Sequence, residues 1–189
     1  HHSTDLVNWE LIGHGINRKE QLGKVNLIDV QQQGGIHAPS IRYNKEIFYI
    51  VVTNVYSPKD NTLPAEMVNF VLTAKDPKGP WSKPHIIEGA PGIDPDLFFD
   101  DDGKVYFVGT HDTGQPTVNG IGEIWVQELD LNDWKLIGPR SSIWRGACGG
   151  CCVEGPHIYK KNGLYYLMVA EGGTSRNHAV MIANSDDIR

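Results

Sequence analysis

Short apolar runs separated by turn residues recur along the chain, whereas apolar residues at helical spacing are scarce. The clearest runs cover residues 47–52, 105–108 and 164–169, and they are rich in β-branched and aromatic side chains, which favours strands. Asp102-Gly103 and Asn162-Gly163 precede the second and third of these runs. Such pairs are typical of two-residue hairpin turns, because both central positions adopt positive φ. The pattern therefore predicts an all-β chain built from hairpins.

The hairpins belong to a repeat that is marked by proline. A proline-containing segment precedes each hairpin, at 37–43, 93–99 and 154–160, and Pro39, Pro95 and Pro156 lie at similar intervals. Interleaved with these segments, a tryptophan follows an aspartate by four or five residues in three places. A repeat of about 40–60 residues with about four strands is typical of a β-propeller. A β-sandwich whose hairpins resemble one another by chance is the alternative, and three paired matches in register disfavour it.

The repeat accounts for only part of a propeller. Residues 5–13 would end one blade, 36–90 and 91–145 would form two more, and 152–189 would begin another. A propeller ring closes with about 4–8 blades, so about three blades are expected here, with apolar faces uncovered at both ends. We therefore expect residues 1–189 to form a single partial propeller domain, truncated at both ends. Such a domain would belong to a longer protein or be completed by another chain.

The residues that come just before the prolines are the candidates for chemistry, because the first strands of all blades converge on the propeller axis. These residues are His37 with Ala38, then Asp94, then Glu154. Taken singly, Asp94 fits a turn residue and Glu154 fits a solvated strand end. Two carboxylates that approach one axis from adjacent blades are, however, the pair that glycoside hydrolysis requires.

Five segments together resemble glycoside hydrolase family 43, which includes β-xylosidases and α-L-arabinofuranosidases on a five-bladed propeller. The motifs that carry the resemblance are Gly-Gly-Ile-His-Ala-Pro at 34–39, Ile-Asp-Pro-Asp at 93–96 and Glu-Gly-Pro-His at 154–157, with further likeness at 5–11 and 170–174. The resemblance implies inverting hydrolysis of terminal β-1,4-xylosyl residues of plant-cell-wall oligosaccharides, with α-L-arabinofuranosyl residues as a further substrate.

The resemblance also assigns roles to individual residues. Glu154 matches the general acid, and Asp94 matches the aspartate that modulates the pKa of that acid. The general base of the family belongs to an Asp-Pro motif that would lie upstream of His1. His37 stands where β-xylosidases of the family usually carry tryptophan, and Ala38 matches a small residue that lets the sugar approach.

Two further residues match an inner segment of the last blade, namely Thr174 and His178. Either they line the sugar pocket or they take part in ordinary strand packing, and the sequence leaves both interpretations open.

Composition narrows the range of partners. The net charge is −6, so nothing favours nucleic acid or an anionic membrane as a partner, and a neutral oligosaccharide fits. No apolar run approaches the roughly 20 residues that a membrane span needs. No signal peptide is visible, so the compartment, extracellular or cytoplasmic, stays open, as does the oligomeric state.

The cysteines form one odd-numbered cluster, Cys148, Cys151 and Cys152. A zinc site usually draws four ligands from two separated pairs, so free thiols or one local disulfide are expected instead of a metal site. We expect no required cofactor, although the resemblance is compatible with calcium at the propeller axis.

Two other functions remain open at this stage. One is an arabinofuranosidase or arabinanase on the same scaffold. The other is a non-catalytic or inactive sugar-binding propeller, which the absence of the base from residues 1–189 and the presence of His37 would support.

Overall fold

A computed structural model describes residues 1–22, 30–60, 62–112, 122–147, 151–174 and 176–189. Within these ranges the chain forms one short 3-10 helix, η1 (Lys19–Gln21), and eleven strands in three antiparallel sheets. The strands are β1 (Gly35–Asn44), β2 (Ile47–Tyr56), β3 (Glu66–Ala74), β4 (His85–Ile86), β5 (Ile93–Phe99), β6 (Val105–His111), β7 (Glu123–Asp130), β8 (Lys135–Trp144), β9 (Glu154–Lys161), β10 (Leu164–Glu171) and β11 (Ala179–Ser185).

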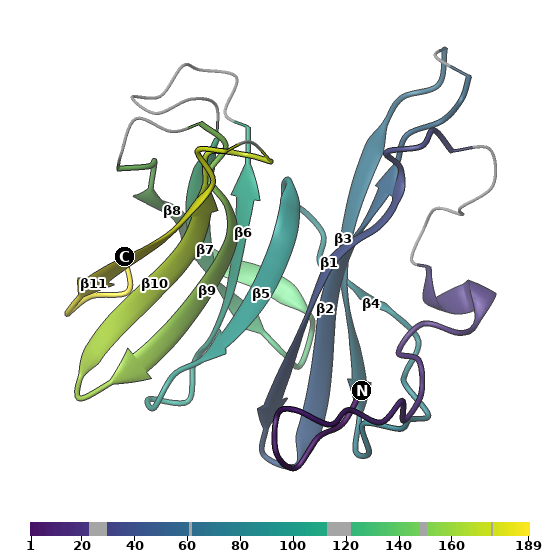
Figure 1. Cartoon of the computed structure of the whole chain (residues 1–189), viewed down its shortest axis with the longest axis horizontal. Helices are drawn as coiled ribbons and strands as arrows, with labels where there is room; N and C mark the ends of the chain where they lie inside the picture. The colour runs from purple at the N-terminus through teal and green to yellow at the C-terminus, as the bar shows by residue number, and fades with distance from the viewer. Residues whose placement is uncertain (23–29, 61, 113–121, 148–150, 175) are drawn as a thin grey trace.

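The three sheets are arranged as propeller blades. Their strand orders are β1-β2-β3-β4, β5-β6-β7-β8 and β9-β10-β11, so that β1, β5 and β9 are edge strands. These three strands lie next to one another, and each sheet extends away from them (Figure 1). The expected all-β class and partial propeller are therefore confirmed, with three blades in the part of the chain that the structure describes. No helix among the described residues is long and apolar enough to cross a membrane.

The hairpin turns agree with the sequence in one case and differ in another. Asn162 and Gly163 both have positive φ, as a two-residue turn requires. Asp102 does not, and only Gly103 is left-handed there. The N–H of Gly103 and that of Asp100 instead bond to the carbonyls of Asp100 and Lys104. A turn of three residues closed by a left-handed glycine replaces the predicted two-residue turn, which was wrong.

The middle blade is buried on both faces. On one face, Leu97, Phe107 and Trp125 pack with Tyr49 and Val71 of the first sheet. The opposite face packs against the third sheet through a second cluster, which includes Phe98, Tyr106, Val108, Ile124, Val126, Ile158 and Val169. Burial on both faces explains why residues 105–108 form an unbroken apolar run and do not alternate with polar residues.

The outer face of the third blade carries exposed apolar side chains, as the sequence led us to expect, whereas the outer face of the first blade is largely covered, with Val52, Phe70 and Leu72 fully buried. Val180 and Ile182 of β11 are 61% and 67% exposed, whereas Met181 between them packs against the core. On β1, Ile41 and Tyr43 are also exposed. Both pairs lie on faces turned away from the middle blade.

Candidate active site

A β-bulge interrupts each of the inner strands β1, β5 and β9 at its proline motif. The residue before the proline is left-handed in all three strands, with φ of 40° at Ala38, 54° at Asp94 and 58° at Gly155. A left-handed residue that carries a Cβ costs roughly 1–3 kcal/mol, and such strain is concentrated at functional sites. The repeat therefore places the same backbone feature at equivalent positions of three neighbouring blades.

Asp94 and Glu154 do not occupy equivalent positions, contrary to the repeat as we interpreted it. Gly155 is the structural counterpart of Asp94, and Glu154 lies one residue earlier, where the first blade has His37. In a regular strand, neighbouring residues point to opposite faces. A bulge sets two consecutive residues against one on the partner strand and re-aims a side chain, so both positions reach the same site.

The two candidate carboxylates influence one another across the junction of β5 and β9. The backbone N–H of Gly155 donates a hydrogen bond of 3.0 Å to Asp94 Oδ2. Burial raises the pKa of Asp94, although this N–H and the positive charges of His37 and His157 lower it. Burial also raises the pKa of Glu154, and the negative charge of Asp94 raises it further. The Glu154 side chain nonetheless stays exposed to solvent at the start of β9.

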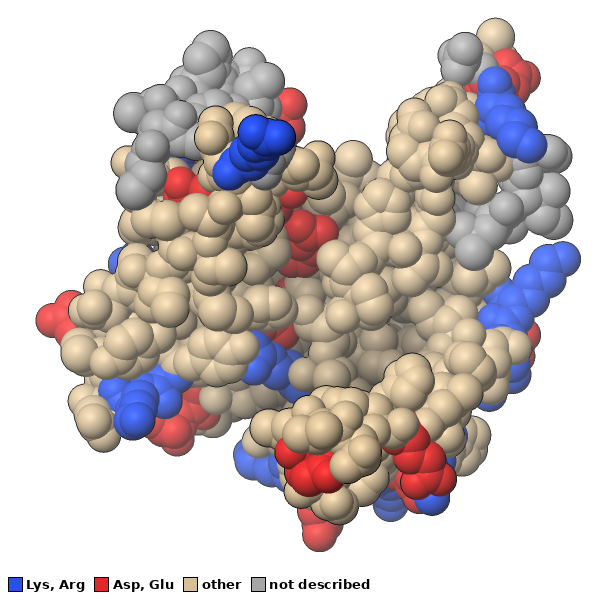
Figure 2. Space-filling model, viewed as in Figure 1, with Lys and Arg blue, Asp and Glu red and all other residues tan. Residues whose placement is uncertain are grey.

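A groove of about 360 Å³ lies along the inner strands. Its lining mixes a carboxylate, a guanidinium, an imidazole and a phenol, from Asp94, Arg42, His157 and Tyr159 respectively. Figure 2 shows the hollow between the first and third sheets, with acidic atoms on its wall. Such a lining offers donors, acceptors and an aromatic ring, which suits a ligand that carries several hydroxyl groups.

Three of the four predicted sugar-binding residues lie beside the carboxylates or in the groove. Ala38 lines the groove. His37 affects the pKa of Asp94 through its charge, and its Nε2 is 3.0 Å from the carbonyl oxygen of Gln33. His178 lowers the pKa of Glu154 through its charge. The fourth, Thr174, is exposed in the β10–β11 connection, and its part in sugar binding stays a prediction.

Sequence analysis missed the residue that joins the three inner strands. Asp96 is fully buried on β5. It accepts a bidentate pair from Arg42 of β1, with Nε at 2.8 Å from Oδ1 and Nη2 on Oδ2. Nδ1 of His157 on β9 lies 2.8 Å from Oδ2, and the Arg42 guanidinium lies 5.0 Å from the ring centroid of Tyr159. The available signal was a polar residue directly after the proline, as in Asp96 and His157, at the start of an apolar run.

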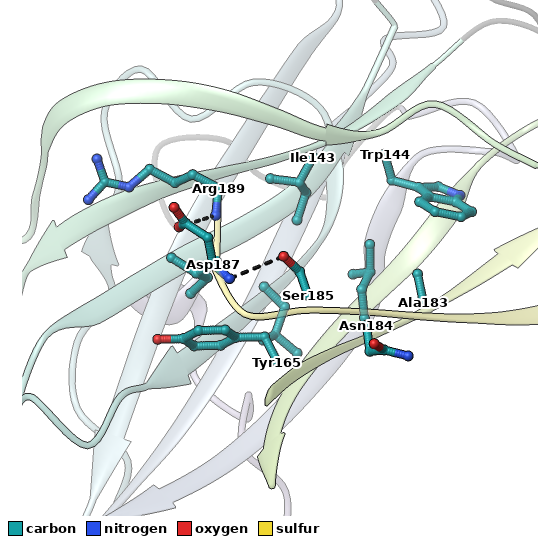
Figure 3. Close-up of a pocket in the computed structure, with 11 residues that line it drawn as sticks. Ile143, Trp144, Tyr165, Ala183, Asn184, Ser185, Asp187 and Arg189 are labelled. Carbon is teal, nitrogen blue, oxygen red and sulfur yellow. Dashed lines mark hydrogen bonds between the residues drawn. The ribbon is translucent and has the colours of Figure 1, made fainter. Parts of the chain in front are cut away.

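A second, apolar pocket lies outside the inner strands, between the second and third sheets. Figure 3 shows Ile143 and Trp144 of β8 on one side, with Tyr165 of β10 and Ala183 of β11 on the other. Asp187 is the one carboxylate among its described lining residues. The pocket contains neither Asp94 nor Glu154, whereas Asp94 lines the groove and Gly155, the neighbour of Glu154, lines it too, so the groove is the candidate active site.

The cysteines and candidate metal ligands add no further catalytic group. Cys151 and Cys152 are free thiols, the first exposed and the second half-buried, whereas Cys148 lies outside the described residues. Among the described residues, no group of three or more His, Cys, Asp or Glu side chains could hold a metal ion. Calcium at the propeller axis stays an untested prediction.

Comparison with known proteins agrees with this geometry. The family model described as glycosyl hydrolases family 43 matches residues 1–189. The chain is 48% identical to the "Xylosidase/arabinosidase" of Butyrivibrio fibrisolvens, over 99% of this chain and 34% of that protein. It is 41% identical to the "Xylan 1,3-beta-xylosidase" of a Vibrio species, over 100% of this chain and 34% of that protein. The chain therefore belongs to glycosyl hydrolase family 43.

Solved structures show the same likeness in three dimensions. The xylan β-1,4-xylosidase from Bacillus halodurans C-125 superposes with a TM-score of 0.82 at 35% identity, which covers 100% of this chain and 35% of that one. A family 43 protein from a capybara gut metagenome gives a TM-score of 0.83 at 39% identity, covering 98% of this chain and 34% of that one. Residues 1–189 thus span about a third of the length of the relatives that they match.

The Asp96 cluster yields the first testable prediction. Replacing Asp96 with alanine should lower the free energy of unfolding by about 3 kcal/mol, because it leaves the half-buried Arg42 guanidinium and the His157 imidazole without the carboxylate that they share. Urea unfolding of the native polypeptide measures the loss. Asp102→Ala is the matched control: Asp102 is exposed and its Lys104 partner is 4.0 Å away, so a loss of at most about 1 kcal/mol is expected. Equal losses in the two variants would contradict the role of Asp96.

Proposed function

We propose that the protein containing this chain is an inverting glycosidase that removes terminal β-1,4-xylosyl residues from plant-cell-wall oligosaccharides. Glu154 is the general acid and Asp94 modulates its pKa. The observation that carries the proposal is the pairing of these carboxylates across β5 and β9. The negative charge of Asp94 raises the pKa of Glu154, and the Gly155 N–H holds Asp94 in place.

The pairing suits an acid that must keep its proton until the glycosidic bond breaks. A carboxyl group with an ordinary pKa is ionised near neutral pH, whereas a neighbouring carboxylate and partial burial favour the protonated form. Glu154 then protonates the glycosidic oxygen as the sugar leaves. Because Glu154 is open to solvent, the leaving oligosaccharide can reach it.

Inversion also requires a base that activates water on the other face of the sugar. Acid and base are about 6.5–9.5 Å apart in inverting glycosidases, with the water between them. In family 43, by the resemblance noted above, the base belongs to an Asp-Pro motif that would lie upstream of His1. Residues 1–189 would therefore supply the acid, its modulator and part of the sugar pocket.

The substrate is proposed from the relatives and from the groove. Among the relatives, the Butyrivibrio protein is named a xylosidase/arabinosidase, and one Bacteroides ovatus relative is named an α-L-arabinofuranosidase. Ala38 lines the groove with Asp94, and His37 lies near enough to Asp94 for its charge to affect that carboxyl. A small side chain at 38 leaves room for a pentose, and the imidazole of His37 can stack on a sugar or bond to a hydroxyl.

The role of Glu154 is tested by Glu154→Gln in the native polypeptide. Turnover of an unactivated xylo-oligosaccharide should fall by about 10²–10⁴-fold, since the amide cannot donate the proton. A nitrophenyl xyloside, whose leaving group needs little protonation, should lose less. Xylose affinity measured by calorimetry should be retained. Unchanged turnover of the oligosaccharide would remove Glu154 from the mechanism. Xylose binding by a native polypeptide that hydrolyses neither substrate would favour the non-catalytic sugar-binding propeller.

The role of Asp94 is tested by the pH profile of Asp94→Asn. The acid is active while protonated, so activity falls as pH rises through the pKa of Glu154. Asp94 raises that pKa, so its neutralisation should move the alkaline limb of kcat/KM to lower pH. In Asp94→Asn the pKa of Glu154 should still be partly raised, because burial is the largest cause of its rise.

Two further variants control this measurement. Asp101→Asn removes a carboxylate that is 86% exposed in the hairpin turn after β5, and it should leave the limb where it is. His178→Gln removes the imidazole whose interaction with Glu154 lowers the pKa of that carboxyl, so it should move the limb to higher pH. A limb that stays in place in Asp94→Asn would exclude Asp94 as modulator.

Sugar specificity is tested with paired nitrophenyl substrates. We expect kcat/KM to be higher for the β-D-xyloside than for the α-L-arabinofuranoside, because the Vibrio and Bacillus halodurans relatives are named xylosidases. The opposite ratio would support an arabinofuranosidase on the same scaffold.

A further inference from the structure

Cys151 and Cys152 form a pair of adjacent thiols that the proposed mechanism does not use. Cys151 is exposed and Cys152 is half-buried. The Cys151 thiol lies close enough to the Cys152 thiol to raise its pKa. Both also lie against Gly173, since a Cβ built there would be 3.5 Å from the Cys152 sulfur and 3.8 Å from the Cys151 sulfur. The two sulfur atoms therefore point to the same side of the chain, although adjacent residues of an extended segment alternate.

The backbone on both sides of the pair is held by hydrogen bonds. The carbonyl of Cys151 accepts a bond of 2.7 Å from the N–H of Gly172. The carbonyl of Val153 accepts a bond of 2.6 Å from the buried hydroxyl of Thr110. Cys152 itself is left-handed, with φ of 63°. Because the backbone is fixed at 151 and 153, the convergence of the two thiols is part of the fold and costs little ordering on binding a ligand.

The surroundings favour a ligand that takes two sulfurs and leaves no charge. The neighbouring Cys151 thiol, together with burial and the negative charge of Glu154, raises the pKa of the Cys152 thiol to about 11. A lone thiolate is therefore disfavoured beside Glu154. Tetrahedral zinc would need four ligands, and no group of three ligating side chains exists among the described residues. A trivalent arsenic that carries one organic group needs two sulfurs and forms a neutral product.

We propose that Cys151 and Cys152 form a vicinal-dithiol site for monosubstituted trivalent arsenicals. With phenylarsine oxide as the ligand, two arsenic–sulfur bonds form and the arsenic–oxygen bond breaks. The two thiol protons leave with the oxygen as one water molecule, and arsenic stays trivalent. The reaction needs no oxidant or reductant, and it yields a ring that is closed by the peptide link between the two cysteines.

The site has a consequence for catalysis, which rests on the proposed function. Glu154 follows Cys152 by two residues and lies close enough for its charge to affect the thiol. A phenylarsenic group on the two sulfurs would occupy the space beside the proton donor. We therefore expect occupancy of the dithiol to inhibit glycoside hydrolysis.

The test uses the native polypeptide with phenylarsine oxide, and intact mass is its primary readout. One phenylarsenic group should add per chain with the loss of two protons. 2,3-Dimercaptopropanol should remove the adduct, whereas 2-mercaptoethanol at the same thiol concentration should not. Cys151→Ser and Cys152→Ser should each weaken capture by about a hundredfold or more, because the second arsenic–sulfur bond is lost. Cys148→Ser, the matched control, should retain full capture.

Two results would overturn the site. One is loss of the adduct in Cys148→Ser, and the other is undiminished capture in either of the remaining serine variants. Cys152→Ala repeats the test without a hydroxyl, and an unfolding temperature equal to that of the native polypeptide shows that each variant is folded. The mass readout does not depend on glycosidase activity. An adduct on an inactive protein would therefore refute the proposed function and support the dithiol site. An active protein without the adduct would support the proposed function and refute the dithiol site.

Discussion

The buried carboxylate of Asp96 is the interaction on which the geometry of the axis depends. Inner strands of different blades share no backbone ladder, so their relative height must be set by side chains. Asp96 bonds at once to Arg42 of the first blade and to His157 of the third. A charge that is removed from water must be fully paired to be tolerated, and this requirement fixes the register of the three strands. The position of Asp94, two residues before Asp96, follows from it.

Asp94 and Glu154 lie close together, but their surroundings affect the ionisation of the two carboxyl groups differently. Asp94 accepts a backbone hydrogen bond and lies near two histidines, so the burial that opposes its charge is partly offset. The nearby charge of Asp94 raises the pKa of Glu154, and no hydrogen bond to the Glu154 carboxylate is found among the described residues. The difference in character comes from the backbone: the bulge on β9 turns the Gly155 N–H toward Asp94, while Glu154 stays open to solvent.

The sequence predicts those features of the structure that are encoded within a few neighbouring residues, and it predicts poorly those that depend on contacts between distant segments. The proline segments and apolar runs predicted the all-β class, the blade order and the inner strands, because each signal lies within a few residues. The turn at Asp102-Gly103 was wrong, since the Asp-Gly pair does not reveal that Asp100 and Lys104 close a longer loop. The one-residue offset between Asp94 and Glu154 and the pairing of Asp96 with Arg42 also went unseen. The offset can be read from the spacing to the prolines, since Asp94 directly precedes Pro95 and Glu154 precedes Pro156 by two residues. The pairing depends on contacts between blades, which spacing along one chain does not encode.

Gly155, at the bulge of β9, is a position where the site can accept a new side chain. Its φ of 58° is one that asparagine and aspartate tolerate, and no atom lies within 4 Å of the place where its Cβ would stand. The first blade fills this position with a methyl group and the second with a carboxylate. The third blade thus has room at the corresponding position, where an asparagine or aspartate side chain can be added without moving a strand.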